Sequence, residues 1–205
     1  MNRLAGLYAI TMDGIQGGAL LAQAGAALEG GCRILQYRDK SGDAQRRRKE
    51  AQALLALCHE YRAILIINDD LELCRRCDAH GVHLGHDDMP VEAARNALGR
   101  DKIIGISCYN DLQRGHRAAS QGADYLAFGA IYPSVTKPAA ANASLALLQR
   151  AKSKLDPPIV AIGGITPENA GQVIQAGADM VAMIQGLFGQ EDIRHAAQKT
   201  TRLFK

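Results

Sequence analysis

Gln36, Arg38 and Lys40 occupy alternate positions where an apolar run becomes polar, and this spacing has direct chemical consequences. In an extended strand alternate side chains share one face, so these three would project together, while Tyr37 and Asp39 would project to the opposite face. Two cations that point the same way are compatible with a solvated edge or with an anion bound between them. The spacing alone does not choose between these two cases.

Acidic residues follow two further apolar runs. Asn68, Asp69 and Asp70 come directly after the first run, and Asp88 lies between the second run and Pro90. One of the adjacent aspartates is expected to cap the next helix, and Asp88 taken alone could also be a cap. Two carboxylates at neighbouring strand ends, near a pair of cations, suit a Mg²⁺ ion that keeps several waters and bridges substrate phosphates. We therefore predict Asp69 and Asp88 as Mg²⁺ ligands.

Two more polar residues and one long loop belong to the same set of candidates. His83 is predicted to be packed or hydrogen-bonded rather than a zinc ligand, because no second histidine follows a strand at a helpful spacing. Ser107 is predicted to position substrate, because the sequence shows no triad that would activate it as a nucleophile. The longest loop, YPSVTKPAAANAS, carries Lys137 among small residues and is expected to shield the site from water.

Eight short β-rich apolar runs must position these side chains. In chain order they are LYAIT, RILQY, AILIIN, GVHLG, KIIGIS, YLAFGAI, PIVAIGG and MVAMI, and stretches of helical period lie between them. Strands this apolar are covered on both faces. The pattern predicts an α/β fold, a (β/α)₈ TIM barrel formed by a single domain over residues 1–205. A doubly wound sheet is the less favoured alternative, because no GxGxxG turn follows an early strand.

A barrel of this kind carries its chemistry at the carboxyl ends of the strands. The loops after the last two strands commonly bind phosphate through backbone N–H groups, and Gly163 and Gly164 follow the seventh strand. A tight turn would also explain two adjacent glycines. Together with the cationic site at Arg38, Lys40 and Lys137, these loops would form a second, milder anion site. We infer two phosphorylated substrates that are joined, one of them carrying a diphosphate.

Composition excludes several classes of partner. The net charge of +3 is the small difference between 24 basic and 21 acidic residues, so a nucleic-acid or membrane-surface binder is not expected and small-molecule substrates are. The five cysteines are expected to be buried thiols, including the CxxC pair, which lacks a second pair to hold zinc. The run RRRK at 46–49 is predicted to be solvated helix surface. Without a membrane-length apolar run or a signal peptide, the expected location is cytoplasmic. The oligomeric state is not predicted.

Seven segments of the chain resemble the thiamine-phosphate synthase family, and they occur in the same order. They are QYRDK, IIND, GVHLGHDDMP, GISC, FGAIYPSVTK, AIGGITPENA and AGADMVAMI. The resemblance implies that the protein joins 4-amino-5-hydroxymethyl-2-methylpyrimidine diphosphate to a thiazole phosphate, releasing diphosphate and giving thiamine monophosphate. It implies that Mg²⁺ and the cations stabilise the departing diphosphate, and that the thiazole nitrogen then captures the pyrimidine methylene cation.

The same resemblance implies roles for individual residues. Those implied to contact the pyrimidine diphosphate are Gln36, Arg38, Lys40, Asn68, Ser107 and Lys137, and Tyr37 and Asp39 are also predicted to bind substrate. Those implied to contact the thiazole phosphate are Ser134, Val135, Thr136, Gly164, Ile184 and Gln185. Asp69 and Asp88 would hold Mg²⁺, and the implied catalytic residues are Arg38, Lys40, Ser107 and Lys137. Gln185 replaces the serine usual in the family, so its side-chain contact with the thiazole phosphate is in question.

Two other functions are compatible with the sequence. A thiazole tautomerase of the same fold would not need the full diphosphate and metal set, and a non-catalytic barrel would bind phosphorylated ligands without turnover. The presence of Arg38, Lys40, Asp69, Asp88 and Lys137 favours the synthase.

Overall fold

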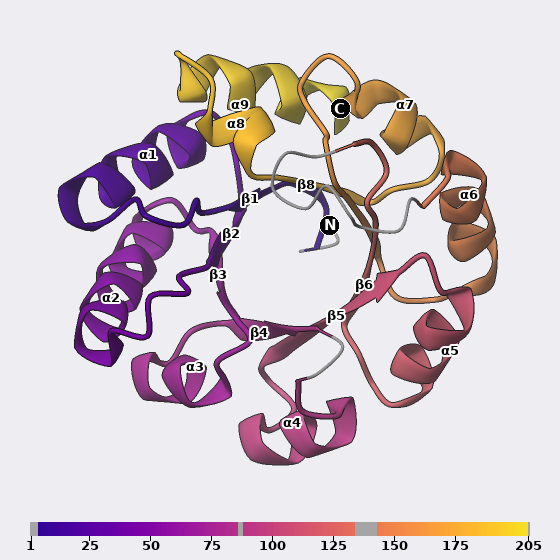
Figure 1. The fold of residues 1–205 in the computed structure, drawn as a ribbon, viewed down its shortest axis with the longest axis horizontal. Helices are drawn as coiled ribbons and strands as arrows, with labels where there is room; N and C mark the ends of the chain where they lie inside the picture. Colours follow the sequence, from indigo (N-terminus) through magenta and orange to yellow (C-terminus); the bar gives the residue numbers. More distant parts are fainter. Residues whose placement is uncertain (1–3, 86–87, 134–142, 205) are drawn as a thin grey trace.

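The computed structural model describes residues 4–85, 88–133 and 143–204, and its strands form a closed parallel barrel in chain order (Figure 1). The strands are β1 (Gly6–Ile10), β2 (Ile34–Tyr37), β3 (Ile64–Asn68), β4 (Gly81–Leu84), β5 (Ile103–Tyr109), β6 (Tyr125–Phe128), β7 (Ile159–Ile162) and β8 (Met180–Met183). Pairing of β1 with β8 closes the barrel, with Gly6 opposite Met180. The predicted (β/α)₈ barrel is therefore confirmed.

Helices surround the barrel on its outside (Figure 1). They are α1 (Gly17–Glu29), α2 (Ala44–Glu60), α3 (Leu71–Cys77), α4 (Val91–Leu98), α5 (Leu112–Ser120), α6 (Leu145–Lys154), α7 (Ala170–Gln175), α8 (Gln185–Phe188) and α9 (Ile193–Thr201). A short 3₁₀ helix, Arg202–Phe204, follows α9. Side-chain caps start several of these helices; Asp43 accepts from the Arg46 amide at α2, and Ser144 accepts from the Leu147 amide at α6.

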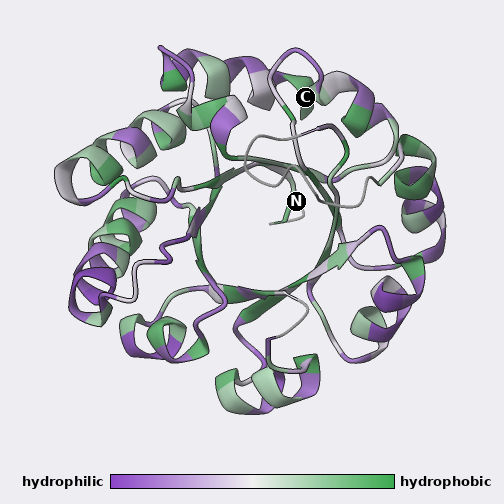
Figure 2. Ribbon diagram, in the orientation of Figure 1, coloured by the Kyte–Doolittle hydropathy of each residue, from purple (hydrophilic) through white to green (hydrophobic). Residues whose placement is uncertain are grey.

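The strands alternate between two apolar layers. On β1, Leu7 and Ala9 belong to the core between strands and helices, whereas Tyr8 and Ile10 belong to the core inside the barrel. Figure 2 shows that the strands are largely hydrophobic, whereas the helices carry both hydrophilic and hydrophobic residues. The alternation along each strand determines which of its residues face the barrel interior, and therefore which residues of β2, β3 and β5 face the cavity.

Tyr125 lies inside the barrel against a glycine of the neighbouring strand. A Cβ atom at Gly105 would fall 1.8 Å from Cζ of the Tyr125 ring, so any larger residue there would displace the ring. The Tyr125 side chain is fully buried and packs edge-on against Tyr8, with ring centroids 5.8 Å apart. A glycine in β5 therefore makes room for an aromatic hydroxyl at the centre of the barrel.

Two sequence predictions about the surface have different outcomes. All five cysteines are buried and free, as predicted, and burial raises the pKa of each thiol. The predicted solvated surface at 46–49 is wrong in part, because Arg46 pairs with Asp39 at 2.8 Å and Arg47 pairs with Asp70 at 3.0 Å. These two arginines link α2 to the ends of β2 and β3. Within the described residues, no helix has both the length and the apolar character needed to cross a membrane.

Candidate active site

A cavity of about 780 Å³ opens at the carboxyl ends of the strands. Its wall includes Gln36 and Arg38 from the end of β2, Asn68 from β3 and Ser107 from β5. On the other side it includes Gly164, Ile184 and Gln185 from the loops after β7 and β8. The structure thus brings together residues predicted for both substrates, in a cavity large enough for two small molecules.

The alternate residues of β2 face different surroundings, as their spacing predicts. Gln36 and Arg38 line the cavity. The Tyr37 hydroxyl instead donates to Glu50 of α2 at 2.6 Å, and the Asp39 carboxylate is paired with Arg46. Both side chains point toward α2. Their side chains therefore do not line the cavity, because successive side chains of an extended strand face opposite ways. The prediction that Tyr37 and Asp39 bind substrate now depends on their backbone groups and stays a prediction.

Arg38 is held by residues that follow β1, which the sequence predictions did not include. Its guanidinium forms an ion pair with Asp13, and its side chain is 13% exposed. Thr11 Oγ1 accepts from the Arg38 amide at 2.8 Å and donates to the Arg38 carbonyl at 3.1 Å. The signal was present in the sequence, because Thr11 and Asp13 follow the first strand just as the other candidates follow theirs.

The three polar residues after β3 have separate roles. Asp70 is the helix cap, because its Oδ1 accepts from the Leu73 amide at 2.8 Å. Asp69 has a left-handed backbone, with φ of 62°, and its carboxylate accepts from Nδ2 of Asn68 at 2.7 Å. One aspartate of the pair therefore caps, as predicted, and the other is left available to a ligand.

Asp88 does not cap the helix that follows it. The residue at the start of α4 is Pro90, which has no side-chain cap, and Oδ2 of Asp88 instead accepts from the Gly85 amide. The carboxylate thus lies back over the end of β4, beside that of Asp69. The sequence left two roles open for Asp88, a helix cap or a ligand at the strand ends. This geometry favours the second role.

The carboxyl groups of Asp69 and Asp88 influence each other electrostatically. Loss of water around Asp69 and the nearby Asp88 carboxylate raise the pKa of Asp69 to about 6, while Lys40 and Asn68 act in the opposite direction. Lys40 is exposed and lies beside Asp69 rather than on the cavity wall. Two acids held this close fit a divalent cation. The described residues contain no group of three or more His, Cys, Asp or Glu side chains that could bind a metal, so an ion here would need water or phosphate oxygens as well.

The wall at β7 and β8 is built from backbone packed against backbone. Gly164 has φ of +59°, and a Cβ atom there would lie 2.5 Å from the Pro133 carbonyl oxygen. At Gly186 the added Cβ would lie 2.0 Å from the Ile165 carbonyl oxygen. Both the tight turn and the close approach therefore require glycine. The N–H groups of Gly164 and Gly186 donate to no acceptor among the described residues, and so remain available to a phosphate.

Gln185 turns its side chain along its own helix. Its Nε2 lies 2.2 Å from the position that a Cβ atom on Gly189 would take, so the amide covers Gly189. Gln185 is the first residue of α8 and contributes to the cavity wall. Replacing the usual serine has therefore placed a longer side chain at the rim without filling the space next to Gly164.

Four predicted residues lie outside the described residues. They are Ser134, Val135, Thr136 and Lys137, which belong to the loop expected to shield the site. Their proposed contacts with the thiazole phosphate and the diphosphate therefore stay predictions.

A row of hydrogen bonds crosses the floor of the cavity, and we call its five residues (Gln36, Tyr8, Tyr125, His83 and Ser107) the interior chain. Gln36 Nε2 donates to the Tyr8 hydroxyl at 2.7 Å, and the Tyr8 and Tyr125 hydroxyls are 2.8 Å apart. His83 Nδ1 lies 2.9 Å from the Tyr125 hydroxyl, and Nε2 lies 2.9 Å from Ser107 Oγ. The prediction that His83 is a hydrogen-bonded residue is confirmed. The tyrosines were missed because each appeared to be an ordinary apolar strand residue.

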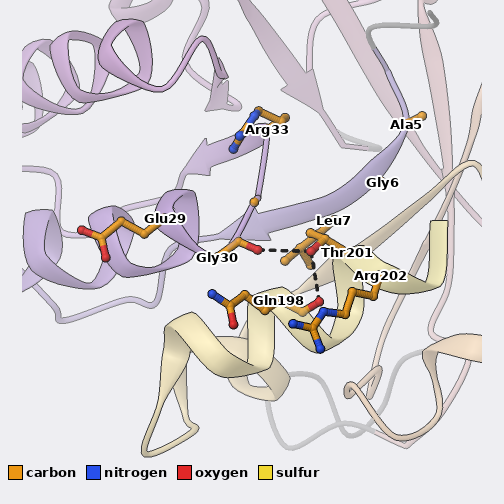
Figure 3. A pocket seen from close by; sticks show the side chains of 10 residues that line it. Ala5, Gly6, Leu7, Glu29, Gly30, Arg33, Gln198, Thr201 and Arg202 are labelled. Atoms are coloured by element: carbon orange, nitrogen blue, oxygen red, sulfur yellow. Dashed lines mark hydrogen bonds between the residues drawn. The ribbon is translucent and has the colours of Figure 1, made fainter. Parts of the chain in front are cut away.

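A second cavity, of about 470 Å³, lies at the opposite end of the barrel, near the start of β1 (Figure 3). Thr201 Oγ1 donates to the carbonyl oxygens of Gly30 and Gln198 there. The guanidinium groups of Arg33 and Arg202 lie apart in Figure 3 and do not converge. Thr201 and Arg33 donate to backbone carbonyl oxygens at this end, whereas the polar side chains of the first cavity line one open space.

The fold and the first cavity define a class. A (β/α)₈ barrel with cationic and acidic side chains at the carboxyl ends of its strands, and glycine turns after β7, is the arrangement of barrel enzymes that act on phosphorylated substrates. Comparison with known proteins gives the family. Residues 7–187 match the family described as thiamine monophosphate synthase. The chain belongs to this family, whose members are transferases.

Individual relatives agree with the family assignment. The chain is 56% identical to the thiamine-phosphate synthase of Nitrosococcus oceani over 197 residues, covering 96% of this chain and 91% of that protein. It is 52% identical to the thiamine-phosphate synthase of Chromobacterium violaceum, covering 96% and 94%. The solved thiamine phosphate pyrophosphorylase of Pyrococcus furiosus superimposes with a TM-score of 0.90 at 32% identity, covering 99% of this chain and 96% of that one.

Proposed function

We propose that the chain condenses 4-amino-5-hydroxymethyl-2-methylpyrimidine diphosphate with a thiazole phosphate, forming thiamine monophosphate and releasing diphosphate. The relatives named thiamine-phosphate synthase, which cover nearly the whole chain, support this activity. The observation that carries the proposal is the division of one cavity into two unlike anion sites, with Arg38 at one side and the Gly164 turn at the other.

The diphosphate is placed at the ends of β2 to β5. Arg38 and Lys40 supply positive charge, and Asn68 and Ser107 supply neutral donors. Arg38 is already oriented by Asp13 and by the two hydrogen bonds of its backbone with Thr11. A preorganised guanidinium stabilises charge that develops on a leaving group without the energetic cost of reorientation during the reaction.

Mg²⁺ is the proposed metal, and Asp69 and Asp88 are its proposed ligands. The fit rests on the two carboxyl groups, which lie side by side after β3 and β4. Burial of Asp69 and the neighbouring Asp88 carboxylate raise the pKa of Asp69 to about 6, which is consistent with this placement. When bound, the ion would neutralise the departing diphosphate as a Lewis acid. The left-handed backbone at Asp69 and the Gly85 amide at Asp88 direct the two carboxylates toward each other before any ion arrives.

The proposed reaction needs no covalent bond to the protein. The bond between the pyrimidine methylene carbon and the diphosphate oxygen breaks, and its electron pair leaves with the diphosphate. The lone pair of the thiazole nitrogen then forms the new carbon–nitrogen bond. Water would compete for the same carbon, and the apolar side chains of Ile10, Val160 and Ile162 in the cavity wall offer water no hydrogen bond.

The thiazole phosphate is placed at the turn after β7 and the start of α8. Backbone N–H groups of Gly164 and Gly186 are the proposed donors, and Ile184 provides apolar surface beside them. A monophosphate carries less charge than a diphosphate. Neutral amides therefore suffice at this side, whereas the other side needs cationic side chains.

The test is a coupling assay with the purified chain, both substrates and Mg²⁺, followed by chromatographic detection of thiamine monophosphate. We expect product that requires all three additions. Absence of product, from a protein whose folding has been verified, would count against the proposal. Aromatisation of a thiazole precursor with indifference to the pyrimidine diphosphate would instead establish a tautomerase.

The proposed setting follows from the same chemistry. The partners are the two small-molecule substrates, with no nucleic acid or membrane required. The cytoplasm is the proposed location, and the five buried free thiols are compatible with its reducing conditions.

A further inference from the structure

The interior chain contains more hydrogen-bonding groups than a barrel floor needs for packing. Its three middle members, Tyr8, Tyr125 and His83, come from β1, β6 and β4, and both tyrosines are at most 1% exposed. A polar group this deep costs free energy unless it is paired, and an apolar side chain of similar size would avoid that cost. These buried polar side chains are therefore expected to have a function beyond packing.

The number of protons available for hydrogen bonding gives the interior chain a direction. Burial raises the pKa of both Tyr8 and Tyr125, so each keeps its one hydroxyl proton. The Gln36 nitrogen can only donate, so Tyr8 accepts from it at 2.7 Å. The Tyr8 proton must then go to Tyr125, because no other acceptor for it is found in the described part of the chain. With the reverse order, Tyr8 would accept twice and its proton would be buried unpaired.

The same direction of donation continues to Ser107, the last residue of the interior chain. Tyr125 accepts from Tyr8 and donates its own proton to Nδ1 of His83 at 2.9 Å. A neutral imidazole that accepts at Nδ1 carries its proton at Nε2, so His83 donates to Ser107 Oγ at 2.9 Å. The Ser107 oxygen is thereby occupied as an acceptor. Its own proton is free to point into the cavity, which Ser107 lines.

We propose that the interior chain runs in one direction, from Gln36 to Ser107, and that this direction makes the Ser107 hydroxyl a hydrogen-bond donor toward the diphosphate substrate. Tyr8, Tyr125 and His83 are then positioning residues that act through Ser107. The inference rests on the proposed function for its substrate. The opposite direction would turn a serine lone pair toward the anion, where it would repel it.

The direction also explains why a serine beside a histidine is not a nucleophile here. In a hydrolytic triad the imidazole accepts the serine proton, and a carboxylate on the far nitrogen stabilises the resulting cation. In the interior chain the far nitrogen of His83 meets the phenol of Tyr125. The proposed direction places the imidazole proton on Nε2, beside Ser107. Ser107 therefore donates to the substrate and keeps its own oxygen unactivated.

A double-mutant cycle tests whether Tyr125 acts through Ser107. The four proteins are the wild type, Tyr125→Phe, Ser107→Ala and the double variant, and kcat and KM are measured for each substrate. We expect each single change to lower kcat/KM for the pyrimidine diphosphate by about tenfold, the usual size of one hydrogen bond to a charged group. In the Ser107→Ala background, Tyr125→Phe should change it by less than about twofold, because the group it acts through is absent.

The cycle has a matched control and a second variant. Tyr61→Phe removes a hydroxyl that lies outside the cavity, where it donates to Glu29 at 3.4 Å, and should leave all kinetic constants unchanged. If Tyr125→Phe does not fold, His83→Leu removes the direct partner of Ser107 Oγ and takes its place in the cycle. Equal losses from Tyr125→Phe in the two backgrounds would overturn the proposal, because a merely structural role is additive.

The tautomer of His83 is a second readout that needs no substrate. Nitrogen-15 NMR of the free protein, with the His83 signals assigned by their loss in His83→Gln, should show a proton at Nε2 and a bare Nδ1. A proton at Nδ1 would mean that the interior chain runs in the opposite direction. This result would overturn the inference even if the coupling assay succeeds. Absence of thiamine monophosphate with the Nε2 tautomer present would refute the proposed function and leave the direction of the chain supported.

Discussion

The two sides of the cavity use opposite means to attract an anion. The charged side consists of Arg38 in the cavity wall, with Lys40, Asp69 and Asp88 next to it at the ends of β2 to β4. The neutral side consists of Gly163, Gly164, Ile184 and Gly186, and no charged side chain among the described residues lines it. Charged side chains attract from a distance and tolerate a mobile ligand, whereas backbone amides act only at contact. The charged side therefore suits the diphosphate, which leaves during the proposed reaction. The neutral side suits the thiazole phosphate, which stays in the product.

The largest expected effect separates Arg38 from its neighbour on the other face of β2. Arg38→Ala should lower kcat/KM for the pyrimidine diphosphate by about 100-fold or more, as for loss of one transition-state donor. Asp39→Ala should instead reduce stability by about 1–3 kcal/mol, because it removes the closer of the two carboxylates that face the partly buried Arg46. Steady-state kinetics and thermal unfolding distinguish the two. Equal kinetic losses would mean that the facing of β2 is assigned incorrectly.

The next effect concerns the paired carboxylates of the charged side. Asp88→Asn keeps an acceptor for the Gly85 amide and removes one of two like charges, so stability without metal should rise by up to about 1 kcal/mol. The increase of Tm with added Mg²⁺ should disappear, and activity should fall by at least about tenfold. Thermal unfolding with and without Mg²⁺ measures both changes. Asp70→Asn is the control, since Asp70 caps α3 and should leave the Mg²⁺ response intact.

A smaller, selective effect is expected on the neutral side. Gly164→Ala introduces a Cβ atom 2.5 Å from the Pro133 carbonyl oxygen at a backbone φ of +59°, which should shift the turn and its N–H group. KM for the thiazole phosphate should rise by about tenfold, the energy of one hydrogen bond to a charged group. KM for the pyrimidine diphosphate should change little. A rise confined to the pyrimidine diphosphate would contradict the division of the cavity into two sides.

The smallest expected effect is at Gln185. Its side chain covers Gly189 rather than the space beside Gly164, so Gln185→Ser should change KM for the thiazole phosphate by less than about threefold, below the energy of one such hydrogen bond. Steady-state kinetics with the thiazole phosphate varied checks this. A tenfold fall in KM would show that the lost serine contact still matters, and would sharpen the neutral side from a backbone site to a side-chain site.

Local features of the chain were predictable to different degrees. All eight strands were anticipated from short apolar runs, because burial on both faces leaves the same signature in each. Asp70 was anticipated as one of two possible caps, but the choice between Asp69 and Asp70 needed the backbone angles. Arg46 and Arg47 were misjudged as solvated. Four cations in a row look alike in sequence, and only their distance from Asp39 and Asp70 separates the half-buried pair from the exposed one.

The sequence by itself determined what depends on one strand at a time. Gln36 and Arg38 share a face because successive side chains of an extended backbone alternate, wherever that strand lies. Only the tertiary structure decided which groups meet across the barrel, such as Tyr8 and Tyr125, whose hydroxyls bond although 117 residues separate them. Closure of eight strands brings together side chains whose positions along the chain carry no record of the contact. That is why the shared face of Gln36 and Arg38 was predictable from the sequence and the interior chain was not.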